Sequence, residues 1–229
     1  MNILAVDTAA VTASAAVMKD GLIAGQVSFT NGLTHSQTIM PMVDYVLKGA
    51  GLTAADIDLF AVSNGPGSFT GLRIGVGTVK GLAYACGRGC AGVSTLKALA
   101  HNIGPTDRLI VPIMDARRNQ VYTAIYRYDG GKITEVSAPE AAGIEELCAR
   151  INEPIIFVGD GVRPYKNKIT ELMGERAGFA PPQLCLQSAA SVCAAALDEA
   201  PVSPQELSVV YLRKPQAERE REERNGGKS

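Results

Sequence analysis

Apolar and polar positions follow two different periods along the first hundred residues. Short apolar runs predict buried β-strands, and they occur at 3–7, 13–18, 22–29 and 58–63. Segment 36–48 instead places its apolar residues at helical spacing, and Gly49 and Gly51 follow it as a stop signal. A second helix is expected over 70–85, after a glycine-rich turn. The pattern therefore predicts three strands, a helix, a strand and a helix.

The same order of elements returns in the second half of the chain. The expected strands are 109–115, 120–128, 132–136 and 155–158, and the expected helices are 140–150, 164–173 and 188–199. Asp7 and Asp115 each close the first strand of their half, and a glycine turn follows the fourth strand in both halves. Residue identity between the halves is poor, so the repeat is one of order rather than of sequence.

Two such units in tandem predict an α/β protein with two lobes, each a mixed sheet covered by helices, and a cleft between them. This is the plan of the superfamily that includes actin, sugar kinases and heat-shock ATPases. We expect an N-terminal actin-like lobe over 1–106 and a reduced C-terminal lobe over 107–215. The remaining residues, 216–229, form a charge run that is typical of a solvated, disordered tail.

Composition narrows the class of protein. The 229 residues are 46% hydrophobic, which is enough for a sizeable core, and the net charge of −1 gives no support for gripping nucleic acid unaided. The five cysteines form no Cys-x-x-Cys pair, which favours reduced, mostly buried thiols. Residues 1–7 lack the start of a signal peptide, and no apolar run reaches the roughly 18 residues of a membrane span. We therefore expect a cytoplasmic protein that does not enter the membrane.

Gly67 and Ser68 lie in the sharpest local motif, Gly-Pro-Gly-Ser-Phe-Thr-Gly-Leu-Arg at 65–73. Glycine permits unusual backbone angles, and Ser68 or Thr70 can cap the following helix. A helix N-terminus also attracts phosphate or another anion. A tight strand-to-helix turn is the favoured interpretation, and the motif is not a Walker loop because no Gly-Lys-Ser/Thr follows at the required spacing.

Four glycines inside one predicted helix need a compensating reason. They are Gly71, Gly75, Gly77 and Gly81. Each interior glycine costs about 0.5–1 kcal/mol relative to alanine. Glycine leaves room for the close approach of another element, which belongs either to the same chain or to a second protein. The sequence leaves both explanations open, and different faces of the helix can serve each of them.

The helix over 36–48 adds a second argument for a partner. One apolar stripe must face the chain's own sheet, and apolar residues off that stripe, such as Met40, suggest a face for another protein. We therefore predict that the two N-terminal helices contact a partner. The predicted contact residues are Ile39, Met42, Val43, Val46, Arg73, Gly75, Gly77, Val79 and Lys80.

An acid at the end of the first strand of each lobe faces nucleotide phosphates through magnesium in the superfamily. That chemistry also needs glycine-rich hairpins, yet no glycine directly follows Asp7 or Asp115, so turn or capping roles are favoured. Arg117 and Arg118 could hold phosphate or RNA backbone, with a surface ion pair as the favoured alternative. The candidates for lying beside a bound nucleotide or anion are Asp7, Thr8, Gly67, Ser68, Asp115, Arg117 and Arg118.

Histidine is scarce, with His35 and His101 far apart in the sequence. No His-Glu-x-x-His pair exists, so we predict no metal site and no cofactor. A Gly-x-Ser-x-Gly elbow is also missing, which argues against a serine nucleophile. The sequence therefore predicts no catalytic residue.

Several of these segments, taken together and in order, resemble the TsaB/YeaZ family. The most specific is 65–73, followed by Gly-Val-Ser-Thr-Leu at 92–96. The shorter ones are Ile-Leu-Ala-Val-Asp-Thr at 3–8, His-Ser-Gln at 35–37, Asp-Ala-Arg-Arg at 115–118, Gly-Asp-Gly at 159–161 and Tyr-Leu-Arg at 211–213. Gln37 stands where the family usually has glutamate.

The resemblance implies an actin-like fold and a role in making threonylcarbamoyladenosine beside the tRNA anticodon. It implies an accessory subunit rather than an enzyme, which binds the catalytic homologue TsaD and the ATPase TsaE and meets tRNA only through that complex. The two N-terminal helices would form a homodimer face that TsaD can occupy instead. Two alternatives are an independent ATP-dependent enzyme and a metallopeptidase. The missing phosphate loops argue against the first, and the missing metal ligands argue against the second.

Overall fold

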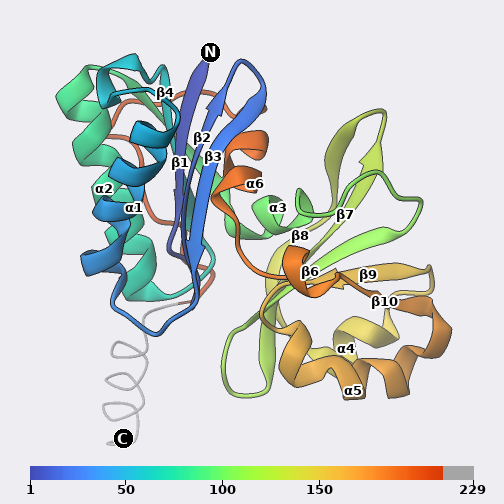
Figure 1. Ribbon diagram of the computed structural model, residues 1–229. Coiled ribbons are helices and arrows are strands. Elements are labelled where there is room, and N and C mark those ends of the chain that lie inside the picture. Colours follow the sequence, from blue (N-terminus) through green and yellow to red (C-terminus); the bar gives the residue numbers. More distant parts are fainter. Residues whose placement is uncertain (214–229) are drawn as a thin grey trace, which may run out of the picture.

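The computed structural model describes residues 1–213, which form two lobes, each built on a five-stranded sheet (Figure 1). The first sheet holds β1 (Asn2–Asp7), β2 (Ala13–Lys19), β3 (Leu22–Phe29), β4 (Leu59–Gly65) and β5 (Gly89–Ser94). The second holds β6 (Leu109–Asp115), β7 (Gln120–Asp129), β8 (Lys132–Gly143), β9 (Ile155–Val158) and β10 (Ala177–Phe179).

The two sheets have the same strand order. It is β3-β2-β1-β4-β5 in the first lobe and β8-β7-β6-β9-β10 in the second. In each lobe the first three strands pair antiparallel, and the fourth and fifth join them in parallel. The duplicated α/β plan with mixed sheets, predicted from the order of elements, is therefore confirmed. Asp7 and Asp115 end the equivalent central strands β1 and β6.

Helices cover both faces of the first sheet and separate the lobes (Figure 1). One face carries α1 (His35–Gly49) and α2 (Phe69–Cys86), and the other carries α6 (Ala189–Ala196). The second sheet is covered by α4 (Ile144–Ala149) and α5 (Val162–Met173), and α3 (Thr95–Ala100) lies between the lobes. Short 3₁₀ turns occupy Ala54–Asp56, Gly174–Arg176 and Pro182–Leu184. Within residues 1–213 no helix has both the length and the apolar character needed to cross a membrane.

One apolar cluster joins the two lobes. Leu96 and Leu99 of α3 pack in it with Leu72 of α2 and with Ile110 and Tyr126 of the second sheet. All five are buried, so the lobes share part of a single core rather than meeting across a polar gap.

The structure has two strands that the sequence pattern does not predict and one segment that it predicts differently. Residues 89–94 form β5 and residues 177–179 form β10, although neither segment has a strong apolar run. The segment 140–143 was expected to begin a helix, but it extends β8, because its residues pair with β7 as far as Gln120 opposite Gly143. The helix α4 therefore begins only at Ile144.

The predicted boundary between the lobes also needs a correction. Val192 of α6 packs in the same buried cluster as Ile3 of β1, so α6 belongs to the first lobe. Beyond it, Val202 pairs with Cys90 of β5, and Leu207 is buried in the core beneath α1 and α2. Assigning 107–215 to the second lobe is therefore wrong for residues 189–210. The predicted tail, 216–229, lies outside the described residues.

Candidate functional site

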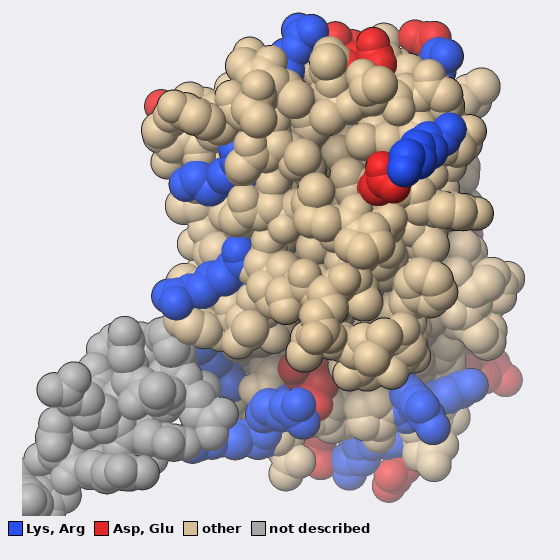
Figure 2. Space-filling view, turned by 60° about the vertical axis from the view of Figure 1, so that its left-hand side comes forward, with Lys and Arg blue, Asp and Glu red and all other residues tan. Residues whose placement is uncertain are grey.

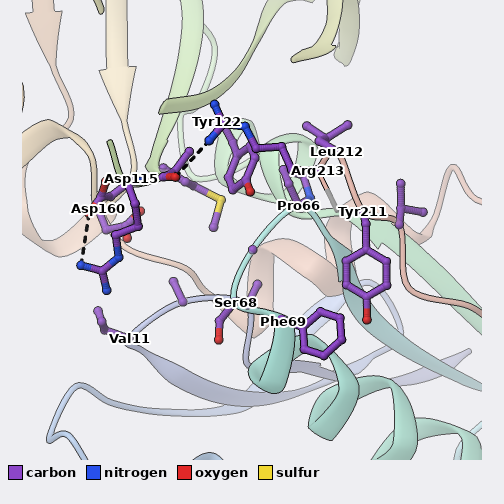
Figure 3. A pocket seen from close by; sticks show the side chains of 17 residues that line it. Val11, Pro66, Ser68, Phe69, Asp115, Tyr122, Asp160, Tyr211, Leu212 and Arg213 are labelled. Atoms are coloured by element: carbon purple, nitrogen blue, oxygen red, sulfur yellow. Dashed lines mark hydrogen bonds and ion pairs between the residues drawn. The ribbon is translucent and has the colours of Figure 1, made fainter. Parts of the chain in front are cut away.

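A pocket of about 530 Å³ opens between the lobes, at the carboxyl ends of the central strands β1 and β6 (Figure 3). One wall is the turn after β1 together with the start of α2, and the opposite wall is the turn after β6. Tyr122 of β7, Asp160 after β9 and residues 210–213 complete the lining. The pocket therefore lies where the duplicated fold predicts a cleft.

Gly67 and Ser68 form the first wall because the turn after β1 comes very close to the start of α2. The Ser68 amide donates to the Ala9 carbonyl at 2.7 Å, and the Ser68 hydroxyl accepts from the Gly71 amide at 3.3 Å as the N-cap of α2. A side chain at position 67 would collide with the backbone of Ala9, so only glycine fits there. Both predicted residues thus line the pocket, and Ser68 also caps the helix.

Asp115 and Arg117 form the second wall, in the turn between β6 and β7. The Asp115 carboxylate accepts from the Arg117 amide at 2.8 Å and lies 3.9 Å from the Arg117 guanidinium (Figure 3). Arg117, Arg118 and Asn119 all have left-handed backbones, with φ of 63°, 54° and 58°. Each left-handed non-glycine residue costs roughly 1–2 kcal/mol, so this turn must be held by its surroundings. Arg118 does not line the pocket.

Asp7 and Thr8 do not line the pocket, and their predicted place beside a bound nucleotide or anion stays a prediction. The Asp7 carboxylate is buried and accepts from the Ser63 hydroxyl at 2.6 Å and the Ala9 amide at 2.9 Å. Its burial raises the pKa of Asp7. The Thr8 hydroxyl, also buried, donates to the Gly71 carbonyl at 2.8 Å. Both side chains therefore fasten β1 to its neighbours.

Asp160 is a titratable group that lines the pocket from the second lobe. Burial raises its pKa from the ordinary value of 3.8 to about 6. Its Oδ1 atom is shielded from solvent and has no hydrogen-bond partner within residues 1–213. The folded chain therefore holds this carboxyl in a place that disfavours its charge.

Replacing Asp160 with asparagine is expected to raise the free energy of unfolding by about 1–3 kcal/mol at pH 7. The pKa is higher in the folded chain, so the folded chain binds the proton more tightly. The wild-type chain therefore loses stability as the pH rises from about 4 to about 6. Asparagine carries no charge, so the gain should vanish near pH 4. Urea unfolding at pH 4 and at pH 7 measures the change in the free energy of unfolding. An equal change at both pH values would contradict a buried carboxylate.

The predicted partner residues of α1 face inward. Ile39, Met42, Val43 and Val46 are all buried in the core beneath the helix, so naming them as contact residues is wrong. The strongest apolar stripe packs on the chain's own sheet because that burial removes the most apolar surface from water. Tyr45 instead points outward and lines a groove of about 660 Å³ between β3 and α1.

The predicted partner residues of α2 divide between several surroundings. Gly75 and Val79 are buried, and a side chain at position 75 would meet Thr8 and Val62, so both serve packing within the chain. Arg73 and Lys80 make hydrogen bonds to residues 205–211, described below. Gly77 is exposed, with open space where a side chain would begin. Gly75 and Val79 therefore offer no surface to a partner, whereas partner contacts of the exposed Arg73 and Gly77 and of the partly exposed Lys80 stay predictions.

Five uncharged residues that remain exposed on these two helices define what we call the outer helix face, and the exposed Asp44–Lys48 ion pair also lies on α1. Its members are Met40, Tyr45, Gly77, Gly81 and Tyr84. Tyr45 is 68% exposed and Tyr84 is 71% exposed. Figure 2 shows this side of the molecule: charged side chains are sparse over the first lobe and more frequent over the second. Such an exposed apolar surface is typical of a protein contact.

Comparisons with known proteins identify the family. Residues 32–210 match the family model described as TsaD, tRNA N6-adenosine threonylcarbamoyltransferase. The chain is 35% identical over 183 residues to the tRNA threonylcarbamoyladenosine biosynthesis protein TsaB of Bacillus subtilis (strain 168), covering 78% of this chain and 79% of that protein. The chain belongs to the TsaB family. The TsaB protein of Escherichia coli (strain K12) is 33% identical over 189 residues, 78% of each chain.

Solved structures support the same TsaB assignment. YeaZ from Pseudomonas aeruginosa has a TM-score of 0.78 at 27% identity, covering 92% of this chain and 99% of that one. The ethanolamine utilization protein EutJ from Carboxydothermus hydrogenoformans shares the fold alone, with a TM-score of 0.52 at 13% identity over 85% of this chain and 90% of that one. The family and the fold expected from the sequence motifs are therefore confirmed.

Four polar residues that line the pocket of this TsaB-family chain were not predicted as site residues. They are Tyr122, Asp160, Tyr211 and Arg213. Asp160 and the pair Tyr211 and Arg213 lie in the Gly-Asp-Gly and Tyr-Leu-Arg motifs that the sequence displays. Those motifs mark the positions, but only the fold brings residues from the end of the described chain beside the turn after β6.

Proposed function

We propose that this chain is an accessory subunit in the biosynthesis of threonylcarbamoyladenosine in tRNA, without catalytic activity of its own. Its Bacillus subtilis and Escherichia coli relatives are named as TsaB proteins of that biosynthesis. Its proposed partners are the transferase TsaD and the ATPase TsaE, and it meets tRNA through their complex. It acts in the cytoplasm and forms a homodimer through the surface that otherwise binds TsaD.

The observation that carries this proposal is the outer helix face. Two tyrosines that are more than two-thirds exposed lie on it with Met40 and two surface glycines. Aromatic side chains and methionine are enriched in the buried centres of protein interfaces, and charged residues are depleted there. The surface glycines allow a partner helix to approach α2 closely. A complex would bury this apolar surface.

The environment of Asp7, at the end of β1, supports a role without catalysis. Both oxygens of Asp7 are already taken by donors from Ser63 and Ala9, and the side chain is 1% exposed. A carboxylate held in this way has no free approach for magnesium or for a reacting group. Gly67, Ser68, Asp115 and Arg117 line the pocket walls and stay the proposed neighbours of a bound nucleotide or anion, with Arg117 as its cation and Asp115 orienting Arg117.

A reconstituted modification assay tests the proposal. Purified TsaD and TsaE, tRNA and the small-molecule substrates are incubated with and without this chain, and modified adenosine is measured. We expect at least a tenfold loss of product when the chain is omitted, and no product when the chain is the only protein. Modification of tRNA by the chain alone would contradict an accessory role, and full activity in its absence would contradict its participation.

A further inference from the structure

The last twelve described residues, 202–213, run along the first lobe as an irregular segment with a turn at 204–206, which we call the C-terminal strap. It begins by pairing with β5, where the amides and carbonyls of Val202 and Cys90 exchange hydrogen bonds of 2.8 and 2.9 Å. Leu207 is then buried in the core, and the Val210 amide donates to the Asn64 carbonyl at 2.8 Å. The strap is thus fixed to the sheet at both ends of this path.

The strap also holds one side of α2. The Lys80 ammonium donates to the Leu207 carbonyl at 3.0 Å, and Arg73 Nε donates to the Tyr211 hydroxyl at 3.0 Å. The rings of Phe69 and Tyr211 stack with centroids 5.1 Å apart, and the Arg73 guanidinium lies 3.8 Å from the Phe69 ring centroid. These contacts fasten the strap from the first turn of α2 to its middle.

Arg213 then crosses to the second lobe. Its guanidinium donates to the Ala116 carbonyl at 3.2 Å and to the side-chain oxygen of Gln120, and it lies 5.8 Å from the centre of the Tyr122 ring. Figure 3 shows Arg213 beside Tyr122 at the edge of the pocket, with Tyr211 on the α2 side. One side chain therefore binds both residues that flank the left-handed turn 117–119.

The contacts of Arg213 stabilise the turn 117–119, whose left-handed backbone is unfavourable by itself. Three successive non-glycine residues with left-handed backbones persist only where the surrounding structure fixes them. The turn itself contributes two backbone hydrogen bonds, from the Ala116 amide to the Gln120 carbonyl and from the Gln120 amide to the Arg117 carbonyl. Arg213 adds charge-assisted hydrogen bonds at both ends of the turn, and such bonds are stronger than neutral ones.

We propose that the C-terminal strap is a latch between the lobes, in which Arg213 pins the turn after β6 to the strap and the strap is anchored on α2. Tyr211 and Arg213 both line the interlobe pocket, so the latch also fixes the width of its mouth. The role concerns the chain by itself and goes beyond the proposed function, because it holds whether or not TsaD binds.

Hydrogen exchange on the full chain, measured by mass spectrometry without any partner, tests the latch. Replacing Arg213 with alanine is expected to speed exchange of the amides in 116–120 at least tenfold, with the amides of β1 and β4 unchanged. The matched control is Arg127→Ala, which removes an exposed ion pair of 2.9 Å with Glu153 within the second lobe. That variant should leave exchange in 116–120 as in the wild type.

A second variant keeps the test decisive if loss of Arg213 disturbs folding. Gln120→Ala removes one of the two acceptors that Arg213 has on the second lobe, leaving the Ala116 carbonyl, and it keeps every anchor of the strap on the first lobe in place. It should speed exchange in 116–120 about threefold or more. Unchanged exchange in this segment in a folded Arg213→Ala or Gln120→Ala chain would overturn the latch, and so would an equal effect of Arg127→Ala.

Discussion

Replacing Gly71 with alanine is expected to lower the free energy of unfolding by about 3 kcal/mol, near the upper end for overpacking a core. The new methyl group would overlap the backbone carbonyl oxygen of Thr8. That carbonyl belongs to the turn directly after β1, in the middle of the sheet, so it cannot move aside without disturbing the strand. Alanine favours the helix by about 1 kcal/mol, which offsets only part of the collision.

Gly77→Ala is the matched control, because it makes the same chemical change six residues further along the same helix. Apart from its own stretch of helix, no atom of residues 1–213 lies within 4 Å of the place where its methyl group would be. We therefore expect this variant to gain about 0.5–1 kcal/mol from helix propensity alone. Urea unfolding of both variants measures the difference. If the two shift stability in the same direction, the division of the glycines into inward and outward positions is wrong.

The glycines show what a sequence can establish about packing. Their unusual number in one helix predicted close approach, and the two candidate neighbours were the same chain and a second protein. Gly71 and Gly75 pack against Thr8, whereas Gly77 and Gly81 have open space around them. A single sequence cannot separate these cases, because the phase of the helix relative to its sheet is set by contacts between distant segments.

Most elements of the fold were predictable because their signals are local. Strand-length apolar runs and helical spacing located β1 to β4 and α1 and α2 closely, and the repeated order predicted two equivalent sheets. The strand β5, Gly-Cys-Ala-Gly-Val-Ser, was missed because small residues give no clear apolar run. Residues 140–143 were assigned to a helix because local propensity is overridden there by pairing with β7.

The return of the chain to the first lobe had no local signal. The alanine-rich helix α6 was predicted as a helix, but its place depends on a fit between its small side chains and the β1–β2 face of the sheet. The strap that follows has no regular period at all. Its path is set by Leu207 in the core and by the hydrogen bonds of Arg73, Lys80 and Arg213.

The candidate site was predictable in part for the same reason. Gly67, Ser68, Asp115 and Arg117 meet in the pocket because the duplicated plan brings the two turns together. The sequence correctly predicts Asp7 at the carboxyl end of β1. The Ser63 hydroxyl on β4 donates to its carboxylate, and nothing in the local sequence indicates that contact. The residues of α1 that were predicted to contact a partner form the apolar stripe that packs into the core of the chain itself.

Tyr45→Ala is expected to weaken binding to the proposed partner TsaD by about 30-fold or more, the effect of truncating an aromatic anchor at the centre of an interface. Tyr45 is 68% exposed and lines the groove with Phe29 and Leu33, so its ring has apolar neighbours but no cover from residues 1–213. A partner side chain entering this groove would bury the ring on both sides. Calorimetry with purified TsaD measures the affinity.

Leu197→Ala supplies the control for that measurement. Leu197 is 53% exposed at the end of α6, on the face of the first sheet opposite to α1 and α2. Both substitutions truncate an exposed apolar side chain of the first lobe and leave the buried core unchanged, so only their position relative to the outer helix face differs. Equal affinities for the two variants would remove the outer helix face as the binding surface. A loss of affinity in Tyr45→Ala alone would place TsaD on the outer helix face of α1 and α2.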